Sequence, residues 1–181
     1  MNAAETPASE KAPFRIETAS EDDWPWIVQG QAEIAWRRLG PERQQTVDCE
    51  TVGQRVAQHI ARLRMDAAFP TQAFVARGED GALAGFVWVA RTHHDFTGQL
   101  EASLLSQYVA EAYRRQGLGR RLMETAEHWA REQGLPRISL SVGTHNVLAQ
   151  NLYKTLGFEV EALRMTKELT RQEPELALSD Y

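Results

Sequence analysis

The sequence predicts an α/β (α+β) domain built on a single mixed, mostly antiparallel sheet of about six or seven strands, flanked by about four helices. Three observations predict it. Short β-prone runs joined by turns fill the first half of the chain. A strand–helix–strand unit then spans 104–142, and such a unit makes its two strands parallel. Between its first strand and its helix lies a glycine turn rich in arginine.

In the first part of the domain, the sequence predicts an edge strand and two helices. Residues 14–18 alternate in polarity, and Ser20 can cap a helix whose first turn is acidic and which Gly40 and Pro41 end. A second amphipathic helix is expected from about Val52 to Met65, because apolar residues recur there at helical spacing before Pro70.

The remaining elements follow from turn signals and periodicity. The runs 73–76 and 83–90 flank an Asp-Gly turn and predict an antiparallel hairpin. The other expected elements are a strand at 104–109, a helix from Leu118, a strand at 137–142, a short helix ending at Gly157, and two closing strands at 158–162 and 163–169.

Length and composition indicate one domain. The chain has 181 residues, of which 43% are hydrophobic, so we expect a domain at 14–172 between tails at 1–13 and 173–181. The single Cys49 excludes an internal disulfide. No apolar run approaches the roughly 20 residues that span a bilayer, and residues 1–13 lack the apolar core of a secretion signal. We therefore expect a cytoplasmic protein that does not bind membranes.

The charge balance argues against a nucleic-acid partner. The net charge is -5 at pH 7, whereas a protein that binds a polyanion needs a basic face. Four of the 20 basic residues nevertheless flank one turn, namely Arg114, Arg115, Arg120 and Arg121. They could hold a polyphosphate ligand or simply form a solvated basic surface.

The glycine turn reads Arg114-Arg115-Gln116-Gly117-Leu118-Gly119-Arg120. Glycines let backbone N–H groups approach a phosphate, and the start of the following helix adds partial positive charge. A P-loop would need Lys and Ser or Thr after the last glycine, and a dinucleotide fingerprint would need a third glycine. Neither is present, so the turn predicts a phosphate site of another kind.

A second motif lies downstream, Asn146-x-x-Ala149-x-x-Leu152-Tyr153-x-x-x-Gly157-Phe158. The two motifs, in this order, resemble those of the GNAT superfamily of N-acetyltransferases. The resemblance implies that acetyl-CoA binds where the strands 104–109 and 138–142 splay apart, and that a primary amine of a small molecule or peptide attacks the acetyl group directly. It leaves the oligomeric state open, a homodimer included.

The same resemblance implies which residues bind the coenzyme. The turn amides of Gln116, Gly117, Leu118, Gly119 and Arg120 would bind the pyrophosphate, and the backbone of Val109 and Glu111 would pair with the pantetheine arm. Further coenzyme contacts are expected from Arg114, Arg115, Asn146, Asn151, Tyr153 and Lys154. Asn146 is also a good helix cap, and Asn151 and Lys154 could face solvent.

For catalysis, the resemblance implies that Tyr153 protonates the departing thiolate, while the Val109 N–H stabilises the developing oxyanion. Many relatives carry a glutamate on the strand before the turn, but the matching residue here is Ser103. Glu101, two residues earlier, could take the amine proton through water. His93, His94 and Asp95 are a second candidate group, without a third partner that would make a metal site.

The resemblance also implies that the acceptor binds between the first helical region and the central strands. Candidate walls are Trp26, Trp36, Trp88 and Gln107, with Trp24 beside them, although tryptophans commonly pack in cores. Glu33 or Glu101 could attract an ammonium group. The alternative function is a non-catalytic sensor or scaffold that binds acyl-CoA, which the missing glutamate keeps open.

Overall fold

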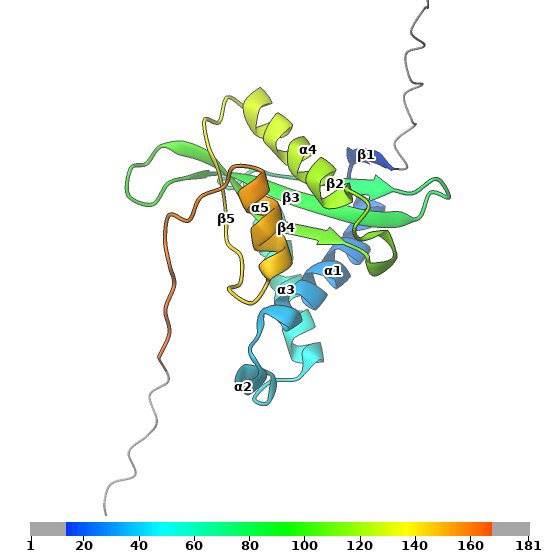
Figure 1. Ribbon diagram of the computed structural model, residues 1–181, viewed down its shortest axis with the longest axis vertical. Coiled ribbons are helices and arrows are strands. Elements are labelled where there is room, and N and C mark those ends of the chain that lie inside the picture. Colours follow the sequence, from blue (N-terminus) through cyan, green and yellow to red (C-terminus); the bar gives the residue numbers. More distant parts are fainter. Residues whose placement is uncertain (1–13, 168–181) are drawn as a thin grey trace, which may run out of the picture.

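Five strands form one mixed sheet in the order β1-β2-β3-β4-β5 in the computed structural model, which describes residues 14–167 (Figure 1). The pairs from β1 to β4 are antiparallel, and β4 pairs with β5 in parallel. The strands are β1 (Arg15–Thr18), β2 (Thr71–Arg77), β3 (Leu83–His93), β4 (Leu100–Val109) and β5 (Ile138–Leu140). The mixed architecture predicted from the sequence is confirmed.

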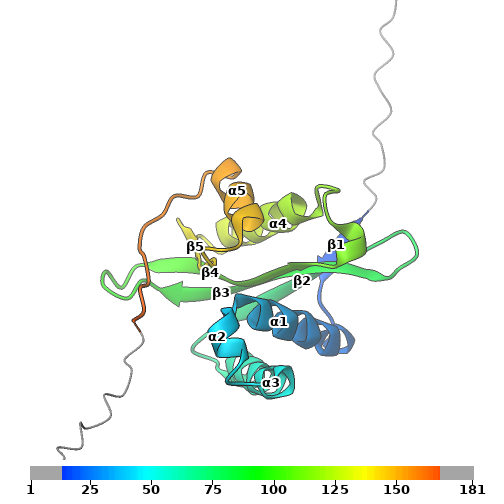
Figure 2. The same cartoon turned by 60° about the horizontal axis from the view of Figure 1, so that its bottom comes forward.

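Helices cover both faces of the sheet. Figure 2 shows α4 (Leu118–Glu132) and α5 (Val147–Thr155) over one face, and α1 (Trp24–Arg38), α2 (Pro41–Gln44) and α3 (Cys49–Met65) below the other. Short 3-10 turns, η1 (Glu21–Asp23) and η2 (Glu111–Tyr113), precede α1 and α4. Asp48 caps α3 by accepting a hydrogen bond from the Thr51 N–H at 2.7 Å, as the residue type favours.

The apolar core is divided by the sheet into two layers. One layer joins β-strand residues such as Val87 and Leu104 to the inward face of α4, including Leu122. The other joins Phe86 and Trp88 to Ile27 of α1 and Ile60 of α3. Gly30 allows α1 to lie this close, because a Cβ at this position would stand only 2.7 Å from the Phe86 ring.

The end of the domain differs from the prediction, because the expected strands 158–162 and 163–169 are not formed within the described residues. β5 has only three residues, so its outer edge offers little backbone for a further strand to pair with. The chain instead turns away at Gly157 (φ 87°), and residues 159–167 are all exposed. The expected tails 1–13 and 173–181 lie outside the described residues, as do residues 168 and 169.

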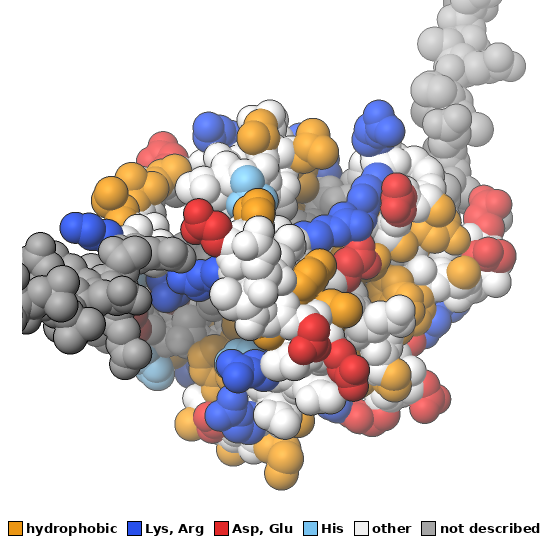
Figure 3. All heavy atoms as spheres, turned by 90° about the horizontal axis from the view of Figure 1, so that it is seen from below, with side chains coloured by type: hydrophobic (Ala, Val, Ile, Leu, Met, Phe, Trp, Pro, Cys, Tyr) orange, Lys and Arg blue, Asp and Glu red, His pale blue; other side chains and the backbone are white. Residues whose placement is uncertain are grey.

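The surface carries mixed charge. On the face shown in Figure 3, basic and acidic side chains are interspersed with hydrophobic ones. Among the helices within residues 14–167, none has the length and apolarity that a membrane crossing requires.

An ion pair between buried Asp23, directly before α1, and Arg77 fixes the start of α1 to the end of β2. Asp23 is 4% exposed and accepts hydrogen bonds from the Ser20 N–H at 2.9 Å and from Arg77 Nη2 at 2.7 Å. Burial raises the pKa of Asp23, but the hydrogen bonds from Ser20 and Arg77 outweigh it, so the pKa lies below its ordinary value of 3.8. The charged form of Asp23 therefore stabilises the fold.

Replacing Asp23 by Asn should destabilise the domain by about 2 kcal/mol at pH 7, because Arg77 then lacks its buried partner. A carboxylate whose pKa is depressed in the native state contributes stability above its unfolded pKa and loses it as the pH falls through the native value. The difference in unfolding free energy between D23N and the unchanged protein, measured by urea denaturation, should therefore shrink below about pH 4. Exposed Asp22→Asn is the control, and an equal or pH-independent loss in both variants would contradict the assignment.

Candidate active site

β4 and β5 part after a short parallel stretch. Their pairing ends at Leu104 and Leu140, whereas β4 continues to Val109. Leu105 has no partner on β3, because Trp88 pairs with Ser106 and Val89 with Leu104. Such a bulge bends a strand and increases its twist, which separates the end of β4 from β5. The splayed strand pair expected from the sequence is present.

The backbone of Val109 points into the resulting opening. The Ala110 N–H donates to Ala84 O on β3 at 2.9 Å, and alternate residues of a strand direct their N–H and C=O groups to opposite edges. The N–H and C=O of Val109 therefore face the edge that β5 leaves. The carbonyl accepts a hydrogen bond from Arg114 Nε at 3.1 Å.

The glycine turn presents a run of unpaired amides. Arg115 (φ 60°) and Gly117 (φ 78°) adopt left-handed conformations that turn the chain into α4. Within residues 14–167, no amide from Arg115 to Arg120 donates to a protein acceptor; the first helical bond runs from the Arg121 N–H to Gly117 O at 3.2 Å. Unpaired N–H groups at a helix N-terminus suit an anion, so the turn fits a phosphate group.

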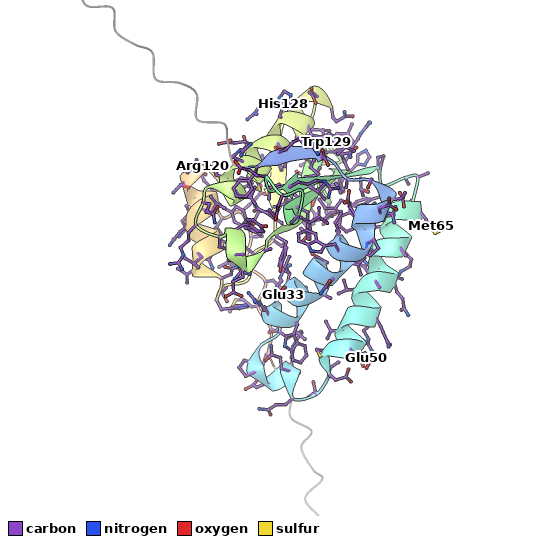
Figure 4. The ribbon with its side chains drawn as sticks, turned by 90° about the vertical axis from the view of Figure 1, so that its right-hand side faces the viewer. Glu33, Glu50, Met65, Arg120, His128 and Trp129 are labelled. Carbon is purple, nitrogen blue, oxygen red and sulfur yellow. The ribbon has the colours of Figure 1, made fainter. Side chains whose placement is uncertain are left out.

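The four arginines around the turn have different partners. Arg115 is exposed, and Arg120, at the start of α4, donates to Thr155 Oγ1 at 3.1 Å (Figure 4). Arg121 points elsewhere and donates to Phe14 O at 2.9 Å. Arg114 donates to the Val109 carbonyl. Of the four arginines, Arg115 and Arg120 are therefore the two whose side chains lie on the solvent side of the turn.

Gln107 connects β4 to both helices above it. Its Nε2 donates to Gly119 O of α4 at 2.5 Å, and its Oε1 accepts from the Tyr153 hydroxyl of α5 at 3.1 Å. Burial raises the pKa of Tyr153, and the positive charge of Arg38 lowers it to a smaller extent. Asn146 caps α5 by accepting from the Ala149 N–H at 3.2 Å. The structure thus places Gln107 beside Tyr153.

The end of α1 closes the opening from the other face of the sheet. Arg38 Nη2 donates to Ser141 O, directly after β5, at 3.4 Å, and His145 Nε2 lies 3.1 Å from Arg37 O. The segment between β5 and α5 is thereby held against α1.

A polar cluster lies beside Val109 on the α1 side of β4. Glu33 of α1 accepts a hydrogen bond from the Tyr108 hydroxyl at 2.7 Å and pairs with Arg37 at 2.6 Å, and Arg114 lies 4.0 Å away (Figure 4). Burial and the Glu33 carboxylate raise the pKa of Tyr108. No sequence motif predicts Tyr108 as a site residue, although its position between Gln107 and Val109 on one strand could have indicated that it lies at the site.

Glu101 is not brought to Tyr153. It is 8% exposed and accepts a hydrogen bond from Ser139 Oγ at 3.0 Å, where β4 and β5 are still paired. Six residues separate it from Gln107, which is roughly 20 Å along a strand at about 3.3 Å per residue. An amine beside Tyr153 would therefore lie far from Glu101, so the water-mediated role expected for Glu101 stays a prediction without support from this geometry.

The tryptophans serve mainly as core. Trp88 is 1% exposed and packs edge-on against Trp24 with ring centroids 5.5 Å apart, so it cannot line an acceptor site. Trp26 packs edge-on against Phe86 and Tyr108 in the same layer, and Trp36 is half-buried at the end of α1.

The other candidates lie at the surface. Glu111, Asn151 and Lys154 are exposed around the opening. In the β3–β4 hairpin, His94 Nδ1 accepts from the Thr97 N–H at 3.2 Å, which is a turn contact. Among residues 14–167, no group of three or more His, Cys, Asp or Glu side chains could hold a metal ion.

Solved structures share this fold. A putative acetyltransferase from Pyrococcus furiosus superposes with a TM-score of 0.74 over 86% of this chain and 99% of that one, at 26% identity. An aminoglycoside 6'-N-acetyltransferase from Acinetobacter baumannii superposes with a TM-score of 0.61 over 87% and 99%, at 15% identity, which supports the fold alone.

Characterised sequences are similar as well. An aminoglycoside N(6')-acetyltransferase of Serratia marcescens is 37% identical over 55% of this chain and 71% of that enzyme. A mycothiol acetyltransferase of Nocardiopsis dassonvillei is 30% identical over 85% of this chain, which spans 47% of that enzyme.

The model of the acetyltransferase (GNAT) family matches residues 33–158, which include β2 to β5, the glycine turn and Tyr153. Since this match covers more than half of the sequence, the chain belongs to the GNAT family and is an acyltransferase.

Proposed function

We propose that this protein transfers the acetyl group of acetyl-CoA to a primary amine of a small molecule or peptide. One observation carries the proposal: the unpaired amides from Arg115 to Arg120 lie directly after the open edge of Val109. A ligand that combines a pyrophosphate with an extended amide-bearing arm matches that arrangement. The expected cytoplasmic location, and the expected absence of nucleic-acid and membrane partners, stay predictions.

The coenzyme would be held mainly by backbone. The amides from Gln116 to Arg120 would bind the pyrophosphate, with Arg115 and Arg120 adding charge. The N–H and C=O of Val109 would pair with the pantetheine arm as an added strand would, which requires Arg114 to share the Val109 carbonyl. Asn146, Asn151 and Lys154, on the exposed side of α5, would contribute peripheral contacts.

In the reaction, the amine nitrogen would attack the acetyl carbonyl carbon and the C–S bond would break. The Val109 N–H would stabilise the oxyanion that develops on the carbonyl oxygen. The Tyr153 hydroxyl, oriented by Gln107, would protonate the departing thiolate, and the ammonium proton would leave to water. Because burial raises the pKa of Tyr153, its hydroxyl stays protonated at neutral pH.

Tyr153→Phe should lower kcat by about 10²- to 10⁴-fold, because the proton donor is lost while the ring remains. The Kd of acetyl-CoA, measured by calorimetry, should stay the same. In the unchanged protein, the loss of activity that deprotonation of Tyr153 causes should begin only above about pH 10. Tyr113→Phe is the control, since Tyr113 lies in η2 and its ring packs on Phe14. Full activity of Y153F would exclude Tyr153 as the acid, and a protein that binds acetyl-CoA without turnover would favour the sensor.

Gly117→Ala should weaken acetyl-CoA binding at least tenfold, about 1.4 kcal/mol, because its Cβ would project beside the unpaired amides. A Cβ at Gly117 meets no protein atom within 4 Å, so the domain should fold. Gly98→Ala is a matched control, since Gly98 also has a positive φ (66°) and open space around it, in the β3–β4 hairpin. Equal affinity in both variants, compared by calorimetry, would refute the phosphate site.

A further inference from the structure

An apolar pocket lies between α1 and α3, apart from the coenzyme opening. Its volume is 570 Å³, within the range of about 300 to 1,000 Å³ typical of small-molecule sites. Most of its wall is apolar, with Ala35 and Leu39 on α1 and Val52 and Val56 on α3. A pocket of this kind suits an uncharged, hydrophobic group.

The pocket face of α1 leads to the opening. Gln31, Ala35 and Arg38 recur at positions i, i+4 and i+7, which share one face of a helix. At one end of this face, Gln31 accepts a hydrogen bond from Ser106, the residue before Gln107 on β4. At the other end, Arg38 contacts Ser141 O on the segment that leads from β5 to α5. Arg38 is not part of the pocket wall, but it follows Ala35 by less than one turn on the same helix face and reaches the segment that precedes α5.

The charges around this path favour an anion. The pocket wall contains no acidic side chain, whereas Arg55 and His59 belong to it. Among residues 14–167, Arg38 has no carboxylate within 4.0 Å, and its one hydrogen bond is the long contact to Ser141 O. The only carboxylate of the cluster beside Val109, Glu33, is already paired with Arg37 and approached by Arg114. In the part of the chain that the structure describes, neither Arg38 nor Arg55 has a carboxylate within 4.0 Å, so a polycationic acceptor would be repelled by both.

We propose that the acceptor is an α-amino acid with an apolar side chain, an inference that rests on the proposed function. The side chain enters the α1–α3 pocket, the carboxylate binds the Arg38 guanidinium, and the α-amine faces the acetyl group beside Tyr153. Amine, carboxylate and side chain share one carbon in such a molecule, which suits an arginine on the helix face that carries Ala35 of the pocket wall and contacts the segment before α5. The nitrogen bonds to the acetyl carbon as the C–S bond breaks, giving an N-acetylamino acid and the coenzyme thiol, while the ammonium proton passes to water.

The test measures coenzyme A release with L-leucine, L-leucinamide, spermidine and kanamycin as acceptors. The kcat/KM for leucine should exceed that for leucinamide at least tenfold, since the amide lacks the carboxylate. Arg38→Met should abolish this preference by raising the KM for leucine, with the KM for acetyl-CoA unchanged. Arg62→Met, which removes the same charge from the exposed end of α3, should leave both values as they are. Preference for spermidine or kanamycin, or an unaltered leucine KM in R38M, would overturn the inference.

Pocket occupancy is tested by side-chain size. Ala35→Leu reduces the pocket volume and should shift the preference from L-phenylalanine toward L-alanine, whereas an unchanged preference would place the side chain elsewhere. Calorimetric titrations of L-leucine and of acetyl-CoA, each alone, separate the two proposals. Binding of leucine without acetyl-CoA binding would support the pocket and sink the proposed function. Binding of acetyl-CoA, with no amino acid bound or acetylated, would sink the pocket assignment alone.

Discussion

A strand that runs on after its neighbour has left exposes a row of backbone N–H and C=O groups along one edge, and the whole site depends on this. In this protein the pairing of β4 with β5 stops at Leu104 and Leu140, and β4 continues for five more residues, from the bulge at Leu105 to Val109. A sheet edge normally pairs or is covered. Here, within residues 14–167, main-chain donors are unpaired at Val109 and again from Arg115 to Arg120, on either side of the short η2 turn.

Three consecutive residues at the end of β4 connect that edge to the rest of the fold. The Gln107 side chain is hydrogen-bonded to the start of α4 and to the Tyr153 hydroxyl. The Tyr108 hydroxyl donates a hydrogen bond to Glu33 of α1, and the Val109 carbonyl accepts one from Arg114. Because successive side chains of a strand point to opposite faces, the end of one strand can position groups from both helical layers. Displacement of β4 would therefore disturb Tyr153 and the α1 cluster together.

In the proposed function, the two faces of the sheet would divide the tasks of an acyltransferase. The α4 and α5 face, with the glycine turn and Tyr153, would act on the coenzyme and the leaving thiolate. The α1 and α3 face, with Arg38, the Glu33 cluster and the apolar pocket, would receive the acceptor. The segment after β5 is hydrogen-bonded to Arg37 and Arg38 of α1 and continues into α5. It therefore connects the two faces of the sheet at the point where β4 and β5 separate.

Elements that local signals specify could be predicted from the sequence. The glycine turn, the Asn146 cap and the order of the predicted strands and helices up to Gly157 follow from backbone preferences and periodicity, and these are present. The two motifs, separated by a helix and a strand, were enough to identify the family, which the comparisons confirm. Such features depend on residues close together in the chain.

Contacts between distant residues depend on how the strands and helices pack, so they could not be predicted from local signals. Glu101 and Gln107 stand on one strand, yet only Gln107 reaches Tyr153, because β4 separates the two by roughly 20 Å at about 3.3 Å per residue. Trp88 and Trp26 could have lined a site or packed in a core, and burial between α1 and the sheet made them core. The strands expected after Phe158 had the right composition, but a strand forms only where a partner edge exists, and the three-residue β5 offers almost none.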